Sequence, residues 1–332
     1  QMFPWFGVRR SARDVADAKA AAAQHRYESA RLALVHVVKQ HYYEYHYLHQ
    51  AIMITQRGID LLSELEVVVQ TRFKTNTAKH SELVRIQVEL GRLEDSFLSL
   101  QAYRAPLAAK LNATMSRSLD SPLPWPATAP TPRMSLSVDT VMARLQSTSP
   151  ELKALEQVAV ERAAQVRLET KRNYPRIMLG AAVIDTDEAA SPSIADSGKD
   201  PIIAMVGLDL PIWRGAIRAE RKEAEQRSEA ANARKQDRTH TLFADIQIAF
   251  YHFKDAERKI ALYRDNLIPK ALESLAVTQQ AFGSGNSSFM DVIDSERILL
   301  ELELSHQRAA ADHMQRLAEL EMLAGTPLSN PE

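Results

Sequence analysis

Apolar residues recur every three or four positions over two very long stretches of the chain, 8–73 and 216–282. This is the period of an α-helix, sustained well beyond the length of an ordinary one. The chain has only 10 glycines in 332 residues, and each stretch contains a single Gly or Pro. The pattern therefore predicts two long helices, with a kink or break at Gly58 in the first and at Pro269 in the second.

Each long stretch ends in a short polar turn, after which a second helical segment returns. The turns are 74–77 and 283–286, and the returning segments are 79–113 and 288–324. Asn76 stands where Gly285 stands in the other turn, and Asn is the usual non-glycine residue at a left-handed position. Ser288 and Asp291 give the second returning segment a start that resembles a capping box. Two helical hairpins are predicted.

The two hairpins belong to two copies of one plan. Phe73 falls on Phe282 at an offset of 209 residues, and other blocks keep nearly the same offset in the same order. Order at constant spacing indicates an internal duplication. The predicted organisation is a first repeat at 1–120, a Pro-rich connector at 121–137 and a second repeat at 138–325, in which a β-hairpin at 174–213 precedes a helical hairpin at 216–324.

The β-hairpin is predicted from two strands, 174–184 and 202–213, joined by a polar loop at 186–200. The second strand alternates apolar positions on one face with Gly207 and Asp209 on the other. Strands of about 10–12 residues match a tilted membrane strand, although a soluble hairpin gives the same alternation.

Aromatic residues at the ends of these strands favour the membrane interpretation. Trp5, Phe6 and Trp213 lie where a strand would leave a membrane, as in an aromatic girdle. Basic residues follow them directly and could meet lipid phosphates, although a solvated helix face is an equal alternative. These basic residues are Arg9, Arg10, Arg13, Arg214, Arg218, Arg221 and Lys222.

Composition and motifs exclude several classes of function. The formal net charge of −1 gives no general affinity for nucleic acid. The absence of cysteine removes disulfides, Cys-ligated metals and thiol nucleophiles. Five of the ten histidines lie between 25 and 49, but only His46 and His49 share a helix face, so surface positions are favoured over a metal site. With no catalytic motif either, we predict no enzyme, no cofactor and no metal.

The segment 281–294 resembles the turn motif of the TolC family of outer membrane efflux proteins. Phe282 and Gly285 form its aromatic–x–x–Gly, and Asp291-Val292-Ile293-Asp294 follows six residues after the Gly. The segment 206–213 is similar to the family's final strand, and Tyr174-Pro175 to the start of the strand before it. The resemblance extends over nearly the whole chain, because these motifs occur in order within the duplicated plan.

This resemblance implies a mainly α fold with a small β part. The duplicated helical hairpins of three subunits would form a long α-barrel, and four strands from each subunit would form a twelve-stranded β-barrel in the outer membrane. The present sequence shows three strands, so we expect a fragment that lacks the first helix and strand of the first repeat.

The implied function is a passive exit duct in the outer membrane and periplasm of a Gram-negative-type bacterium. Its implied partners are two further copies of the chain, a periplasmic adaptor, an inner-membrane pump of the RND or ABC type, and outer membrane lipid. The alternative is a soluble coiled-coil scaffold or an adaptor-like interaction protein, which would have no use for the hairpin at 174–213. The cargo is not specified by the sequence.

The resemblance also assigns roles at the two turns. Asp291, Asp294 and Glu82 would form acidic rings at the entrance, where carboxylates favour cations, and Phe282 stands in place of the family's gate tyrosine. Ser287 replaces the gate arginine. Without the resemblance, these acids would be interpreted only as complementing the helix dipole. The adaptor would contact Thr75, Asn76, Thr77, Ala78, Gly283, Ser284, Gly285 and Asn286.

Overall fold

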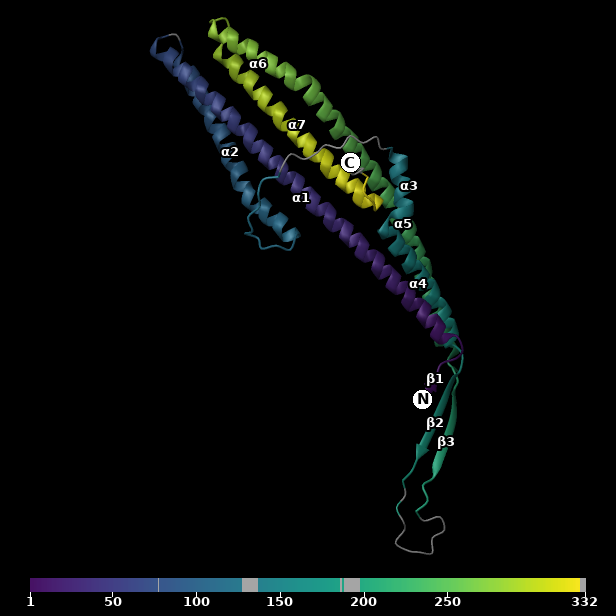
Figure 1. The fold of residues 1–332 in the computed structure, drawn as a ribbon. Coiled ribbons are helices and arrows are strands. Elements are labelled where there is room, and N and C mark those ends of the chain that lie inside the picture. Colours follow the sequence, from purple (N-terminus) through teal and green to yellow (C-terminus); the bar gives the residue numbers. More distant parts are fainter. Residues whose placement is uncertain (77, 127–136, 186, 188–197, 329–332) are drawn as a thin grey trace. The chain divides into compact units, whose positions relative to one another are not determined.

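The computed structural model describes residues 1–328 apart from 77, 127–136, 186 and 188–197. The predicted mainly helical fold with a small β part is confirmed (Figure 1). Thr77, most of the Pro-rich connector and most of the loop at 186–200 lie outside the described residues. The chain divides into two compact units: unit 1 contains 1–29 and 150–241, and unit 2 contains 30–149 and 242–332. Each unit therefore combines parts of both predicted repeats.

Unit 1 is built from a small antiparallel sheet and three helical segments. Its elements are β1 (Met2–Phe3), the start of α1 (Val8–Lys74), α4 (Pro150–Arg172), β2 (Arg176–Val183), β3 (Ile202–Asp209) and the start of α5 (Arg214–Leu262). The sheet order is β1-β2-β3. The predicted strands at 174–184 and 202–213 were too long. Prolines at 175, 201 and 211 flank the observed strands, and proline has no N–H to extend a ladder.

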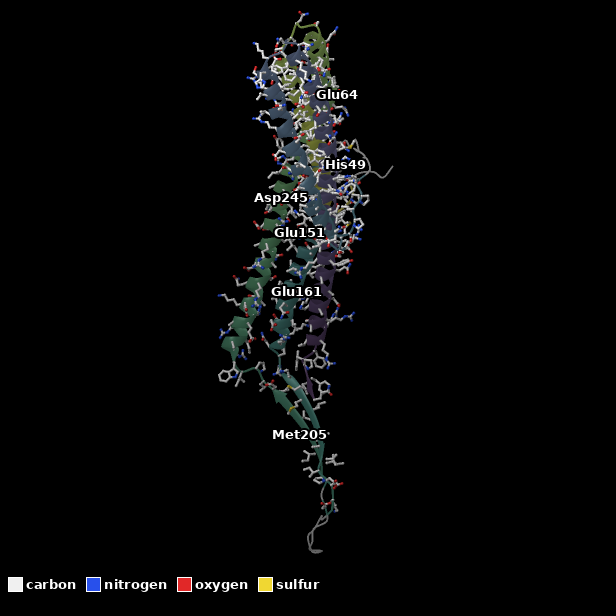
Figure 2. All side chains as sticks on the ribbon, turned by 90° about the vertical axis from the view of Figure 1, so that its left-hand side faces the viewer. His49, Glu64, Glu151, Glu161, Met205 and Asp245 are labelled. Atoms are coloured by element: carbon white, nitrogen blue, oxygen red, sulfur yellow. The ribbon has the colours of Figure 1, made fainter. Side chains whose placement is uncertain are left out.

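The register of β2 and β3 separates two faces. On one face, Ile177 pairs with Leu208, Leu179 with Val206, and Ala181 with Ala204. This face is open to the surroundings of the subunit, since Val206 is 80% and Leu208 59% exposed. On the other face, the Cε atom of Met178 lies 2.8 Å from the position that a Cβ at Gly207 would occupy, so Gly207 leaves room for Met178. Figure 2 shows side chains projecting from both sides of the narrow hairpin, with Met205 labelled.

A glycine sets the direction in which the chain enters α1. Gly7 has φ +81°, which L-residues rarely adopt, and a Cβ there would collide with the Nζ atom of Lys171 in α4. The junction between β1 and α1 therefore favours glycine for its backbone geometry, while the flexible Lys171 side chain could move away from a Cβ.

Unit 2 contains two helical hairpins and a short helix. It holds the rest of α1, α2 (His80–Thr114), α3 (Val138–Thr148), the rest of α5, the π-helical segment η1 (Tyr263–Leu267), α6 (Ile268–Gly283) and α7 (Phe289–Ala324). The predicted hairpins agree with these bounds to within about two residues. Among the residues described, no helix combines the length and the apolar character needed to cross a membrane.

The two predicted helix breakers have different outcomes. A break at Gly58 is wrong, because α1 continues through it without interruption, whereas a kink there stays a prediction. A Cβ at Gly58 would lie 3.3 Å from Leu300 Cδ1 and 3.4 Å from Leu93 Cδ1, so this glycine allows close packing instead. The irregularity at Pro269 is confirmed, since η1 ends just before it. Proline lacks the N–H that an α-turn would use, and a π-turn accommodates the loss.

A single apolar cluster joins the ends of the two hairpins. Its buried members come from α1, α2, α6 and α7, and include Leu62, Ile86, Leu275, Phe289 and Val292. Burying a side chain of this size contributes about 1.5–3 kcal/mol. Figure 1 shows the turns of both hairpins at the same end of unit 2.

The described start of the connector packs against α1 and α2. Trp125 stacks on Tyr45 at 4.6 Å and on His49 at 4.7 Å between ring centroids. The Arg104 guanidinium lies 4.2 Å from the Trp125 ring centroid, and the Tyr45 hydroxyl donates to the Leu123 carbonyl at 3.1 Å. The connector is thus anchored to the helices by an aromatic side chain at this point.

Candidate functional site

The turn between α6 and α7 is fixed by hydrogen bonds to Asp291. The Ser288 hydroxyl accepts from the Asp291 backbone N–H at 3.3 Å, and the Asp291 carboxylate accepts from the Ser288 N–H at 2.9 Å. This reciprocal pair confirms the predicted capping box. The Ser287 hydroxyl also donates to the Asp291 carboxylate at 2.8 Å. These hydrogen bonds, with the one from Ser287 first, lower the pKa of Asp291 and keep it ionised.

The other predicted gate acids lie nearby in their own hairpins. Asp294 accepts from Arg297 at 3.0 Å one turn further along α7, at a half-exposed position. Glu82 lies in the first turn of α2 and is half-buried. The structure thus places all three carboxylates within two turns of a hairpin turn. Their role at an entrance stays a prediction.

Phe282 is part of the contact between the two hairpins. Its side chain is only 8% exposed, and its ring centroid lies 5.8 Å from that of Phe289. The Arg72 guanidinium lies 4.1 Å from the Phe282 ring centroid. It also donates to the carbonyls of Phe282, at 3.1 Å, and Gly283, at 3.4 Å. In the subunit, Phe282 therefore packs inside the tip, and whether it also acts at a gate stays a prediction.

Arg72 is a residue that the sequence reasoning missed. It lies in the last turn of α1 and satisfies carbonyls at the end of α6, which is where a cation is favoured by the helix dipole. An arginine two residues before a predicted turn was the available signal. Its partner across 210 residues could not be read from spacing.

The predicted adaptor residues form two exposed turns. Asn76 and Gly285 both have positive φ, at +57° and +81°, so the predicted equivalence of these two positions is confirmed. Gly283, Ser284, Gly285 and Asn286 are all exposed, as are Thr75 and Asn76, while Ala78 is half-buried. An ordered hydrogen bond from the Asn286 side chain to the Ser284 hydroxyl, at 3.1 Å, shapes the second turn. Adaptor contact remains a prediction for both.

Aromatic side chains gather at the junction between the strands and the helices of unit 1. Trp5 stacks on Tyr174 at 5.8 Å and meets Phe6 edge-on at 5.7 Å. Phe6 and Trp213 are 79% and 77% exposed, so neither is buried by the subunit itself. Tyr174 was predicted as the start of a strand and not as part of this group. At the same junction, Arg176 and Asp209 form a charge-assisted pair across β2 and β3, with Nε 2.9 Å from Oδ2.

His46 and His49 of α1 lie where the connector packs on the helix. His49 stacks on Trp125, and His46 neighbours His49 one helical turn away. Burial lowers the pKa of both, and the charge of Arg104 adds to the effect at His49. Within the described part of the chain, no three His, Cys, Asp or Glu side chains are arranged to hold a metal ion.

Comparison with known proteins gives the same fold throughout. The chain is similar to the VceC outer membrane protein of Vibrio cholerae, with 18% identity, a TM-score of 0.85 and coverage of 99% of this chain and 78% of that one. It is similar to the MtrE outer membrane channel of Neisseria gonorrhoeae, with 19% identity, a TM-score of 0.80 and coverage of 98% and 73%. The nodulation protein T of Rhizobium leguminosarum bv. trifolii is 21% identical over 97% of this chain and 69% of its own length.

A family assignment follows from the sequence as well. Residues 141–326, more than half of the chain, match the family described as outer membrane efflux protein. This family and the similar structures consist of outer membrane channels and not enzymes, and the fold predicted from the TolC resemblance is confirmed. The chain belongs to the outer membrane efflux protein family.

Proposed function

We propose that this chain forms one subunit of a trimeric exit duct that carries the cargo of a tripartite efflux or secretion system through the periplasm and the outer membrane. Transport through the duct would be passive, as the family assignment implies. One observation carries the proposal: the β2–β3 hairpin presents an apolar face that the described residues of the subunit leave exposed.

Lipid is the partner that suits this face. Ile202, Val206 and Leu208 are all more than half exposed. Exposed apolar surface costs about 25 cal/mol per Å² in water, and contact with hydrocarbon removes that cost. In the trimer, four strands from each subunit would close a twelve-stranded β-barrel, which also satisfies the edges of the sheet.

The charges beside the hairpin fit the same placement. Both α1 and α5 begin at the strand junction, and neither has an acid in its first turn, although α2, α3, α4 and α7 all do. Both instead begin with arginines, where the helix dipole disfavours cations. Anionic headgroups at the membrane surface would offset this cost, with the aromatic side chains of Trp5, Phe6 and Trp213 one layer deeper.

The hairpin tips would form the entrance. Three-fold symmetry would gather Asp291, Asp294 and Glu82 of each subunit around one axis, where carboxylate rings favour cations. Hydrogen bonds in its cap keep Asp291 ionised, whereas Asp294 forms an ion pair with Arg297. Phe282, packed inside the tip of each subunit, would support this ring of carboxylates. The exposed turns would dock the helical hairpins of a periplasmic adaptor, which in turn joins an inner-membrane pump.

The assembly is tested with the full-length gene product extracted from membranes. A trimeric native mass in the outer membrane fraction, together with discrete conductance in planar bilayers, is the expected result. A soluble monomer or dimer without conductance would contradict the duct and favour the coiled-coil scaffold.

The entrance is tested by neutralising its acids. Asp291→Asn keeps an acceptor for the cap and removes the charge. Asp294→Asn removes the charge that pairs with Arg297 one turn later. Both should lower the cation-to-anion permeability ratio in bilayers. Glu301→Gln, an exposed acid further along α7, is the matched control and should leave the ratio unchanged. Equal ratios in all channels would remove the two aspartates from the entrance.

Adaptor docking is tested at Ser284, which is exposed and has ordinary backbone geometry. Ser284→Arg should abolish efflux in cells while trimers still form. Ser118→Arg, an exposed loop position after α2, provides the control. Normal efflux with Ser284→Arg would contradict docking at this turn.

A further inference from the structure

Unit 1 contains a hollow of about 570 Å³ whose polar lining consists of arginine alone. Arg26 comes from α1, Arg162 from α4, and Arg227 and Arg234 from α5. The rest of the lining is apolar: Leu155, Val158, Ala230 and Ala231. Figure 2 labels Glu161 on α4, next in sequence to Arg162. Three helices therefore bring four guanidinium groups around one apolar floor.

Three of the four guanidinium groups have no direct ion-pair partner among the described residues. Arg227 pairs with Glu223, with 2.6 Å between Nη2 and Oε1. Arg26, Arg162 and Arg234 form no ion pair or hydrogen bond with any described residue. Other cations of the same helices do find partners: Arg238 pairs with Glu151 at 2.6 Å, and Lys235 with Glu156. The surplus of positive charge is therefore local to the hollow.

A neighbouring hollow of about 380 Å³ provides an internal comparison. It shares Arg162 and Arg227 with the first, but Glu169, Glu220 and Glu223 also line it. An anion entering there would meet carboxylates as well as guanidinium groups. Of the two hollows, the arginine-lined one has only positive charges in its lining and would therefore favour an anion.

The chemistry of the lining defines the ligand. Clustered like charges raise the local potential and attract counter-charge, and the guanidinium fork matches the oxygens of carboxylate, sulfonate and phosphate groups. The apolar floor would bury a hydrocarbon or aromatic body, and the volume lies in the range of small-molecule sites. We propose that this hollow binds amphiphilic organic anions, with the acidic head among the arginines and the body against Leu155 and Val158.

The test uses the full-length channel in nanodiscs of uncharged phosphatidylcholine, titrated calorimetrically with naphthalene-2-sulfonate. Naphthalene-2-sulfonamide, which has the same body without the charge, is the neutral probe. We expect the sulfonate to bind and the sulfonamide to bind much more weakly. Arg162→Gln and Arg234→Gln should each weaken sulfonate binding roughly tenfold, because each removes a charge-assisted hydrogen bond.

Two further variants distinguish binding in the hollow from general electrostatic attraction of the sulfonate to arginines. Arg218→Gln removes the same charge from α5 outside the hollow and should bind as wild type. Arg162→Lys keeps the charge but loses the fork, so it should fall between wild type and Arg162→Gln. Native mass confirms that each variant is assembled.

The proposal is overturned if the assembled channel binds no sulfonate, if it binds the sulfonamide equally well, or if Arg218→Gln weakens binding as much as Arg162→Gln. Conductance of the same preparations separates this inference from the proposed duct. A conducting channel without sulfonate binding removes the ligand site alone, whereas sulfonate binding without conductance leaves the site and contradicts the duct.

Discussion

Phe73 and Phe282 occupy equivalent positions in the two repeats but have different surroundings. Phe73 is 39% exposed, and its ring lies tilted against that of His80 at a centroid distance of 5.6 Å. Phe282 is 8% exposed, lies between Phe289 and the Arg72 guanidinium, and belongs to the apolar cluster shared by both hairpins. A duplicated sequence thus produced one supporting and one peripheral aromatic residue.

The starts of the returning helices show the same asymmetry. The α7 helix begins with a full capping box at Ser288, whereas the equivalent Lys79 gives α2 no side-chain cap. The start of the returning helix in the second hairpin is therefore capped by its own sequence, and Arg72 of the first hairpin joins the two tips.

The largest expected effect is the difference in stability between substitutions at Phe282 and at Phe73. Phe282→Ala should lower the free energy of unfolding by about 3–4 kcal/mol, because it removes a buried ring and leaves a cavity. Phe73→Ala should cost no more than about 1 kcal/mol at its partly exposed position. Urea unfolding followed by helical circular dichroism measures both. Equal losses would show that the two positions support the tip alike.

The next effect concerns a buried acid of α7. Glu296 of α7 is 8% exposed, and burial, followed by the charge of Glu303, raises its pKa to about 7 against a partial opposing effect of Arg57. The folded state therefore holds a proton that the unfolded chain releases near pH 4.5. The contribution of this group to the free energy of unfolding is fully present below pH 4.5. It falls by about 3 kcal/mol as the pH rises to 7.

Substitution by glutamine isolates this contribution. Glu296→Gln should remove the fall in stability between pH 4.5 and pH 7, while Glu301→Gln, exposed on the same helix, should keep it. Unfolding midpoints across this pH range provide the measurement. A fall that persists in Glu296→Gln would assign the pH dependence to other groups.

A smaller effect is expected where the hairpins are tied together. Arg72→Gln removes the cation–π contact and weakens the hydrogen bonds to the carbonyls of Phe282 and Gly283, at a cost of about 1–2 kcal/mol. Hydrogen exchange should accelerate in the turn at 283–288. Arg92→Gln, an exposed arginine of α2, should leave exchange in this turn unchanged. Unaltered exchange in Arg72→Gln would show that Arg72 is not needed for the contact.

The smallest effect sharpens the difference between the two caps. Ser288→Ala should cost about 1 kcal/mol, since it removes the hydroxyl that accepts from Asp291 N–H. Lys79→Ala, at the equivalent position without a side-chain cap, should be nearly neutral. Amide exchange at 289–292 and at 80–83 reports on the two helix starts separately. Similar losses would mean that α2 is capped through a different group.

The candidate site could be predicted in part. The capping box at Ser288 and Asp291 and the left-handed positions Asn76 and Gly285 follow from local geometry that neighbouring residues determine, and the structure confirms them. The burial of Phe282 under Arg72 could not be predicted, because it joins residues 210 apart. The arginine-lined hollow was missed for the same reason, as its members come from three helices.

The sequence by itself determined the helices, their turns and the position of the hairpin, because these follow from apolar period, turn residues and proline, all of which act over a few residues. Tertiary structure decided what Gly58 does, since a glycine in a helical pattern can break the helix or admit a neighbour, and only the approach of Leu93 and Leu300 shows the second. It likewise decided which of two equivalent phenylalanines is buried. These outcomes depend on side chains brought together from distant segments, and no local pattern specifies which segments those are.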